Sequence, residues 1–244
     1  MSEPARDAQP TVLLFDIDGT LLKTGGAGRR SMRRAFVEVC GREDALDGMD
    51  FRGMTDPLIF EGGLARIGVP VSESLVCALA EAYLASLARE VPASPNYQVM
   101  PGVRALLTAL SEHSHVALGI GTGNSEAGAR TKLTHGDLWR HFRFGGYGDD
   151  GWDRVELVRA GATRGAEALG LPLARCRVVV IGDTPEDARA ALGIGATCLA
   201  VLTGGYSDAQ LAAAGSTWVV PDLTHSAVLP RLLGHEEHAA RYSL

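Results

Sequence analysis

Six short apolar runs recur along this 244-residue chain, and segments with helical spacing separate the later ones. The runs lie at residues 12–15, 116–120, 142–147, 178–181, 198–202 and 218–220, and the helical patterns among them at 125–135, 155–169 and 185–192. Uninterrupted apolar runs of this length are typical of strands that are buried on both faces of a parallel sheet. Their alternation with helices predicts an α/β fold, a Rossmann-like doubly wound parallel sheet.

One interval departs from this alternation. The stretch between the first two runs is much longer than one strand–helix–strand crossover, which takes roughly 30 residues. It contains helical patterns at 28–39, 58–67 and 72–89, and Asp56-Pro57 is typical of an N-cap followed by proline at the first helical position. We therefore expect an inserted α-helical domain at 24–98, a core formed by 11–23 and 99–244, and a flexible leader at 1–10.

Composition and charge narrow the functional classes. Hydrophobic residues make up 46% of the chain and charged residues 21%, which is ordinary for a globular protein. The net charge of -6 argues against nucleic-acid binding driven by bulk electrostatics. No apolar stretch is long enough to span a membrane. The four cysteines are scattered, as expected for reduced thiols, so we expect a cytoplasmic protein. We expect it to be either a monomer or a homodimer.

Two carboxylates, Asp16 and Asp18, directly follow the first apolar run, and Gly19-Thr20 comes next. Ligands in open α/β sheets bind at the carboxyl ends of the strands. Two like charges at such a position are costly unless a cation or a proton offsets one of them. The pattern therefore indicates a metal ion, a reacting phosphate, or both.

Polar residues also follow two later runs. Thr122, Gly123 and Asn124 come after the second run, and Asp183 and Asp187 follow the fourth. A doubly wound sheet brings such loops to one edge. Phosphoryl transfer uses a carboxylate nucleophile, a second acid that moves protons, a hydroxyl that holds phosphate oxygens, and Mg²⁺ held by carboxylates.

The chain resembles the haloacid dehalogenase-like superfamily in these motifs and in their order and spacing. The resemblance extends from about residue 11 to 233, and the helical insertion resembles the C1 cap of that family. The resemblance implies that Asp16 is the nucleophile and Asp18 the general acid/base. It further implies that Thr122, with Gly123 and Asn124, binds phosphate. Mg²⁺ would be bound by Asp16, the backbone carbonyl of Asp18 and Asp183, and Asp187 would lie in its outer coordination shell. Within the family the second aspartate separates phosphatases from dehalogenases, so Asp18 points to phosphoryl transfer.

The chain departs from the family pattern at the third motif, which is usually a lysine before the helix that precedes the last motif. Arg154 occupies the corresponding place, and the chain's only two lysines, Lys23 and Lys132, lie elsewhere. An arginine stays charged and can grip two oxygens, so Arg154 is predicted to bridge Asp16 and phosphate.

The resulting prediction is a Mg²⁺-dependent phosphatase, similar to phosphoglycolate phosphatases in layout, that acts on a small phosphorylated metabolite. Arg52, in the insertion, is the candidate for a residue that faces the substrate, and a role at the protein surface is the alternative for it. Two alternatives stay open: a sugar-phosphate mutase of the same superfamily, and a non-catalytic phosphate-binding relative, which the missing lysine motivates.

Overall fold

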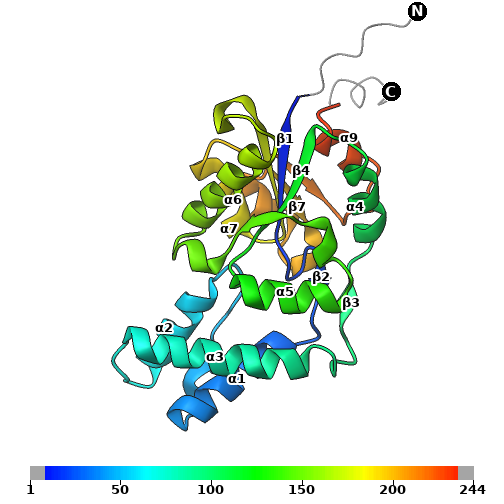
Figure 1. Ribbon diagram of the computed structural model, residues 1–244. Helices are drawn as coiled ribbons and strands as arrows, with labels where there is room; N and C mark the ends of the chain where they lie inside the picture. The colour runs from blue at the N-terminus through cyan, green and yellow to red at the C-terminus, as the bar shows by residue number, and fades with distance from the viewer. Residues whose placement is uncertain (1–8, 236–244) are drawn as a thin grey trace, which may run out of the picture.

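The computed structural model describes residues 9–235, and its centre is a six-stranded, all-parallel sheet (Figure 1). The strand order is β5-β4-β1-β6-β7-β8. The strands are β1 (Thr11–Phe15), β4 (Val116–Gly121), β5 (Phe144–Gly146), β6 (Arg177–Gly182), β7 (Thr197–Val201) and β8 (Trp218–Val220). Each of the six apolar runs forms one of these strands, which confirms the predicted fold class.

Helices cover both faces of the sheet, because successive residues of each strand point to opposite sides. Leu13 and Phe15 pack in the cluster that contains α4 and α9, whereas Val12 and Leu14 pack in the cluster that contains α6, α7 and α8. Their bounds are α4 (Val103–Ser111), α9 (Val228–Leu232), α6 (Arg154–Ala168), α7 (Pro185–Gly193) and α8 (Asp208–Ala213). Both sides of β1 are therefore fully buried.

The interval between β1 and β4 forms three helices with a core of their own. They are α1 (Ala27–Cys40), α2 (Asp56–Arg66) and α3 (Glu73–Glu90), and they enclose the buried rings of Phe36, Phe60 and Tyr83. We call these three helices and their connecting loops the cap. Two short antiparallel strands, β2 (Leu22–Lys23) and β3 (Gln98–Val99), pair where the chain leaves the sheet domain and returns to it. The domain limits at 24 and 98 stay a prediction.

The start of α2 differs by one residue from the expected position. Thr55 is the N-cap residue, and Asp56 and Pro57 are the first two residues of the helix. The Asp56 side chain does not cap the helix. Its Oδ2 accepts a hydrogen bond of 2.9 Å from the backbone N–H of Ser125, in the sheet domain.

The carboxyl ends of β4, β1 and β6 lie side by side and face the cap (Figure 1). Helices begin close after two of these ends: α5 (Glu126–His135) after β4, capped by Ser125, and α7 after β6, capped by Thr184. Because β1 lies between the two crossovers, this edge is the topological switch point at which ligands bind in open α/β sheets. Among residues 9–235, no helix combines the length and apolar character that a membrane span needs.

Candidate active site

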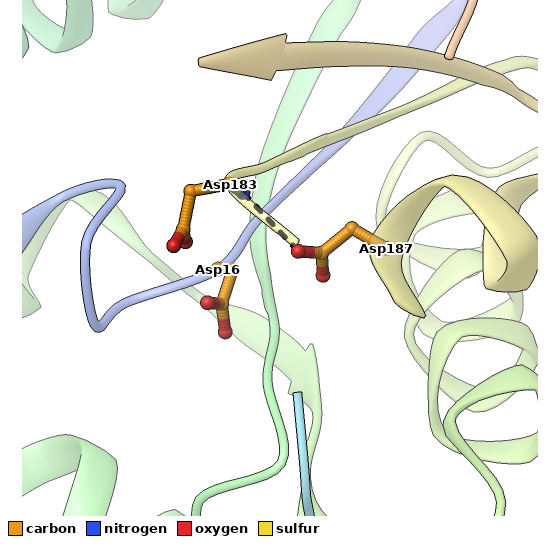
Figure 2. Close-up of side chains that lie close together, drawn as sticks. All are labelled: Asp16, Asp183 and Asp187. Atoms are coloured by element: carbon orange, nitrogen blue, oxygen red, sulfur yellow. Dashed lines mark hydrogen bonds between the residues drawn. The ribbon is translucent and has the colours of Figure 1, made fainter. Parts of the chain in front are cut away.

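Three buried carboxylates meet at this edge of the sheet (Figure 2). Asp16 follows β1, Asp183 follows β6, and Asp187 lies in the first turn of α7. One oxygen from each lies within 4.8 Å of the others. The structure thus brings together three of the five residues that were expected to meet at this edge, and Asp18 and Thr122 lie beside them in the lining of one cavity with Asp16 and Asp183.

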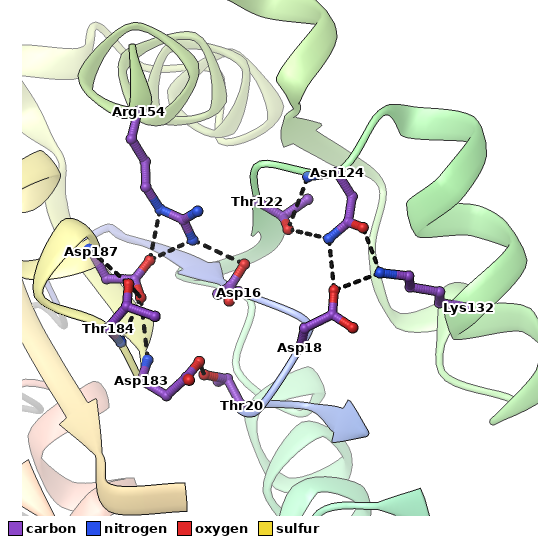
Figure 3. Close-up of polar contacts among 10 residues, drawn as sticks. All are labelled: Asp16, Asp18, Thr20, Thr122, Asn124, Lys132, Arg154, Asp183, Thr184 and Asp187. Carbon is purple, nitrogen blue, oxygen red and sulfur yellow. Dashed lines mark hydrogen bonds and ion pairs between the residues drawn. The ribbon is translucent and has the colours of Figure 1, made fainter. Parts of the chain in front are cut away.

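The guanidinium group of Arg154 lies against this cluster (Figure 3). Arg154 is the first residue of α6, which Asp153 caps, and its side chain is 8% exposed. One terminal nitrogen is 2.9 Å from Asp16 Oδ1 and 2.6 Å from Asp187 Oδ1, and Nε donates to Asp187 at 2.9 Å. The arginine thus bridges the predicted nucleophile and a carboxylate of α7, and the predicted contact with phosphate stays a prediction.

Burial and the neighbouring negative charges raise the pKa of two of the carboxyls, those of Asp16 and Asp183. Burial raises the pKa of Asp16 to about 6, although Arg154 opposes the shift. The pKa of Asp183 is raised well above its usual value, by burial first and then by Asp16 and Asp187. Three carboxylates face one guanidinium, which leaves two formal negative charges in a buried space. A divalent cation with oxygen ligands has the charge and ligand preference that fit this set.

Asp187 and Asp183 differ in how many of their carboxylate oxygens already accept hydrogen bonds. Asp187 Oδ2 accepts from the backbone N–H of Asp183 at 3.2 Å, from that of Thr184 at 3.0 Å and from the Thr184 hydroxyl at 2.7 Å. Its other oxygen accepts from Arg154, so both oxygens of Asp187 are already engaged. Asp183 accepts from Thr20 through Oδ1 at 2.9 Å. Asp183 is therefore better placed than Asp187 to contact a metal ion directly.

Two glycines leave the space around Asp183. A Cβ at Gly204 would lie 1.7 Å from Asp183 Oδ2, and one at Gly19 would lie 2.5 Å from the same oxygen. Gly19 also has a φ of 93°, in the left-handed region that favours glycine. A side chain larger than that of glycine at position 19 or 204 would therefore occupy the space that the Asp183 carboxylate needs.

Asp18 belongs to a second polar network, on the side of the site toward α5 (Figure 3). Its Oδ2 accepts from Asn124 Nδ2 at 2.9 Å and from Lys132 Nζ at 2.6 Å. Asn124 Nδ2 also donates to Thr122 Oγ1 at 2.8 Å, and Asn124 Oδ1 accepts from Lys132 at 2.6 Å. Thr122 in turn hydrogen-bonds Asp16, and this bond opposes part of the rise in the pKa of the Asp16 carboxyl.

A cavity of about 370 Å³ lies between these networks and the cap. Residues of the sheet domain form its floor, and cap residues cover it; the floor includes Asp16, Asp18, Thr122, Asn124, Lys132, Arg154 and Asp183. The cap-side lining includes Arg29, Met32, Phe51, Arg52, Met54, Asp56, Ile59 and Tyr83. The cavity is thus enclosed from two sides, with charged groups at its floor and both apolar and charged groups on the cap.

The cap touches the loop after β4 directly. The backbone N–H of Asp56 donates to the carbonyl oxygen of Gly123 at 2.8 Å, and a Cβ at Gly123 would lie 2.3 Å from the carbonyl oxygen of Met54. Burial raises the pKa of the Asp56 carboxyl to about 6, with Lys132 opposing the shift. The loop that holds Thr122 and Asn124 is therefore also the surface on which the cap rests.

Arg52 lines the cavity, as the sequence prediction of a substrate-facing residue requires. Its guanidinium group already has two partners: the carboxylate of Asp50, at 2.6 Å from Nη2, and the ring of Tyr206, 4.6 Å from Arg52 Cζ. Its side chain is 48% exposed. Contact between Arg52 and a substrate stays a prediction.

Lys132 is the site residue that sequence reasoning missed. The sequence carries only a weak signal for it: Lys132 lies three residues after Ala129 and four after Gly128, on the helix face that the structure buries. A lysine at an apolar position of a helix is rare unless the ammonium group is paired.

Comparison with known proteins agrees with this geometry. A model of the haloacid dehalogenase-like hydrolases matches residues 10–195. A search of curated proteins gave no match.

Solved structures with a similar fold include a hydrolase from Pseudomonas syringae (21% identity, TM-score 0.66, covering 97% of this chain and 100% of that one). A predicted phosphatase from Clostridium acetobutylicum has 19% identity and a TM-score of 0.67, covering 92% and 98%. A β-phosphoglucomutase from Clostridium difficile has 15% identity and a TM-score of 0.67, covering 95% and 99%. Because the family match spans most of the chain and the acidic cluster lies at the expected strand ends, the chain belongs to the haloacid dehalogenase-like hydrolases.

Proposed function

We propose that this hydrolase is a Mg²⁺-dependent phosphatase that cleaves a small phosphorylated metabolite through an aspartyl phosphate on Asp16. The observation that carries the proposal is the position of Asp16. Its carboxylate lies at the cavity floor, between the guanidinium group of Arg154 and the carboxylates of Asp183 and Asp187. A carboxylate at that point can attack a phosphorus atom while nearby positive charge offsets the phosphate oxygens.

In the first step, an oxygen of Asp16 forms a bond to phosphorus, and the bond from phosphorus to the leaving oxygen breaks. Asp18 gives its proton to that leaving oxygen. In the second step, Asp18 takes a proton from water, the water oxygen attacks phosphorus, and the bond to Asp16 breaks, so that inorganic phosphate leaves. Asp18 lines the same cavity as Asp16, which supports this division of roles.

The remaining site residues hold the phosphate group and the metal ion. Thr122, with the backbone N–H groups of Gly123 and Asn124, would hold phosphate oxygens, and Arg154 would add positive charge. Asp16, the backbone carbonyl of Asp18 and Asp183 would bind Mg²⁺, and Asp187 would orient Arg154. When bound, Mg²⁺ supplies positive charge that offsets the phosphoryl oxygens and the buried carboxylates.

The cap supplies the rest of the substrate site. Its loop rests on Gly123, so the cap covers one side of the cavity and the sheet edge forms the other. Arg52 and Arg29 on the cap side would favour a leaving group that carries a negative charge of its own.

A sugar-phosphate mutase would use the same aspartyl phosphate and pass the phosphoryl group to a second hydroxyl in place of water. Two of the proteins with a similar fold are named β-phosphoglucomutase. The matching family model is described as a hydrolase, and we therefore place hydrolysis first. A protein that only bound phosphate would gain nothing from three buried carboxylates, because they repel the anion.

The test is a screen of the purified protein with MgCl₂ over a panel of phosphorylated metabolites, with free phosphate and isomerised sugar phosphate measured in parallel. We expect phosphate release, and we expect Asp16→Asn to abolish it while the circular dichroism spectrum is unchanged. Release of sugar-phosphate isomers without free phosphate would favour the mutase. Turnover by Asp16→Asn equal to that of the wild type would remove Asp16 from the role of nucleophile.

A further inference from the structure

Lys132 is a buried cation inside the site that neither the metal-binding cluster nor the phosphate-binding loop accounts for. Its side chain is 5% exposed, and Nζ lies 2.6 Å from Asp18 Oδ2 and 2.6 Å from Asn124 Oδ1. A buried ammonium group is strongly destabilising without such partners. Its retention here therefore calls for a function of the groups that it contacts.

The first consequence of Lys132 is a fixed orientation of the Asn124 amide. An ammonium group only donates hydrogen bonds, so it requires the amide oxygen of Asn124 to face it. The amide nitrogen must then face the other way, where it donates to Asp18 Oδ2 at 2.9 Å and to Thr122 Oγ1 at 2.8 Å. The carboxylate of Asp18, which only accepts hydrogen bonds, favours the same orientation, so Lys132 and Asp18 together fix the amide from its two sides.

The second consequence concerns Asp18 itself. Both contacts fall on Oδ2, and in Figure 3 the other carboxylate oxygen points away from the amide and the ammonium group. The side chain of Asp18 is 44% exposed, which by itself would leave it free to change rotamer. The two contacts, one from Asn124 in the loop before α5 and one from Lys132 in α5, restrict that freedom and leave Oδ1 for the substrate.

Two helices of the cap lie close to Lys132. A Cβ at Gly28, in the first turn of α1, would lie 3.6 Å from Lys132 Nζ. The Asp56 carboxylate of α2 interacts electrostatically with the Lys132 ammonium group. The Lys132 ammonium therefore lies where α5 meets the cap, beside the part of the cavity that would hold the leaving group.

We propose that Lys132 is a positioning residue that holds Asp18, both directly and through the Asn124 amide, for proton transfer to the leaving oxygen. The inference rests on the proposed phosphatase function. It assigns Lys132 no contact with phosphate, which separates it from Arg154. Misplacement of a catalytic group by about 1 Å can cost roughly 100-fold in rate.

The experiment compares two phosphate esters with one ring each: 4-nitrophenyl phosphate, whose leaving group needs little help from an acid, and benzyl phosphate, whose alkoxide needs a proton. For Lys132→Met we expect kcat/KM to fall about 100-fold for benzyl phosphate and less than about threefold for 4-nitrophenyl phosphate. Asp18→Asn should show the same selectivity. Arg130→Met, which removes an exposed cation from the same helix, is the matched control and should keep both activities within about twofold.

The ratio of the two activities does not depend on the fraction of folded enzyme, so partial unfolding of a variant cannot imitate the expected result. An equal loss on both esters would overturn the proposal, because it would mean that Lys132 binds phosphate or only supports the fold. No loss on either ester would overturn it as well. If the wild-type enzyme with MgCl₂ cleaves neither ester nor any metabolite in the screen, the phosphatase function fails first, and that outcome is visible without any variant.

Discussion

The buried carboxyl of Asp56 permits a quantitative test of how the cap is held against the sheet domain. Asp56 is 6% exposed, and it contacts the loop after β4 twice: its Oδ2 accepts from the Ser125 N–H, and its backbone N–H donates to Gly123. Asp56→Asn keeps the shape of the side chain and an oxygen that can accept the same bond. The substitution removes only the negative charge.

The magnitude follows from the shift of the Asp56 pKa from 3.8 to about 6. One pKa unit corresponds to about 1.4 kcal/mol, so ionising this carboxyl costs the folded state about 3 kcal/mol. Because the folded-state pKa is raised, the folded protein binds the proton more tightly than the unfolded chain. The free energy of unfolding therefore decreases as the pH rises from about 4 to above 6, and Asp56→Asn lacks this decrease.

The assay is urea unfolding, followed by far-UV circular dichroism in EDTA, of the wild type and Asp56→Asn at about pH 4 and pH 8. The free energy of unfolding of the variant, relative to the wild type, should rise by about 2 kcal/mol between these values, since most of the transition lies within them. Asp16 and Asp183 titrate in both proteins, so their contributions cancel in the difference. Parallel pH profiles for the two proteins would refute the burial argument for Asp56.

Two further predictions concern the acidic cluster. Arg154→Met leaves three buried carboxylates without their guanidinium partner. It should therefore lower the free energy of unfolding, measured with urea at pH 7 in EDTA, by about 3–5 kcal/mol. A loss below about 1 kcal/mol would show that the ion pairs of Arg154 contribute little to stability. MgCl₂ at about 100 times its dissociation constant should stabilise the wild type by about 2.7 kcal/mol, visible as a higher melting temperature. Asp183→Asn should lose most of this shift, and an equal shift in both proteins would exclude Asp183 as a ligand.

Much of the fold could be predicted because buried parallel strands need uninterrupted apolar residues, and six such runs stand out in the sequence. The strand order could not be predicted in the same way. It depends on which faces of the helices pack together, and nothing in the run of residues 142–147 indicates that β5 lies at the edge, beside β4. Strand ends were easier to place, since parallel strands align their carboxyl ends whatever their order.

Within the site, residues in short motifs after strands or in the first turn of a helix could be predicted, whereas a residue further along a helix could not. Asp16, Thr122 and Asp183 each follow a strand closely, and the structure brings them together. Lys132 lies two helical turns into α5, and an isolated lysine in a helix is usually exposed. Arg154 was expected at the site, but its ion pair with Asp187 depends on the packing of α6 against α7 and is not visible in the local sequence.

The contact between the Gly123 loop and the start of α2 has a consequence for how the enzyme would respond to its ligands. Gly123, whose N–H is proposed to hold a phosphate oxygen, accepts a hydrogen bond from Asp56 of the cap through its carbonyl oxygen, and Ser125 in the same loop donates to the Asp56 side chain. Phosphate binding and cap seating are then two equilibria with a shared surface, and such equilibria are coupled reciprocally. A substitution on the cap side that weakens its seating by a given factor would lower the affinity for phosphate through this coupling, even though the altered residue never touches the anion.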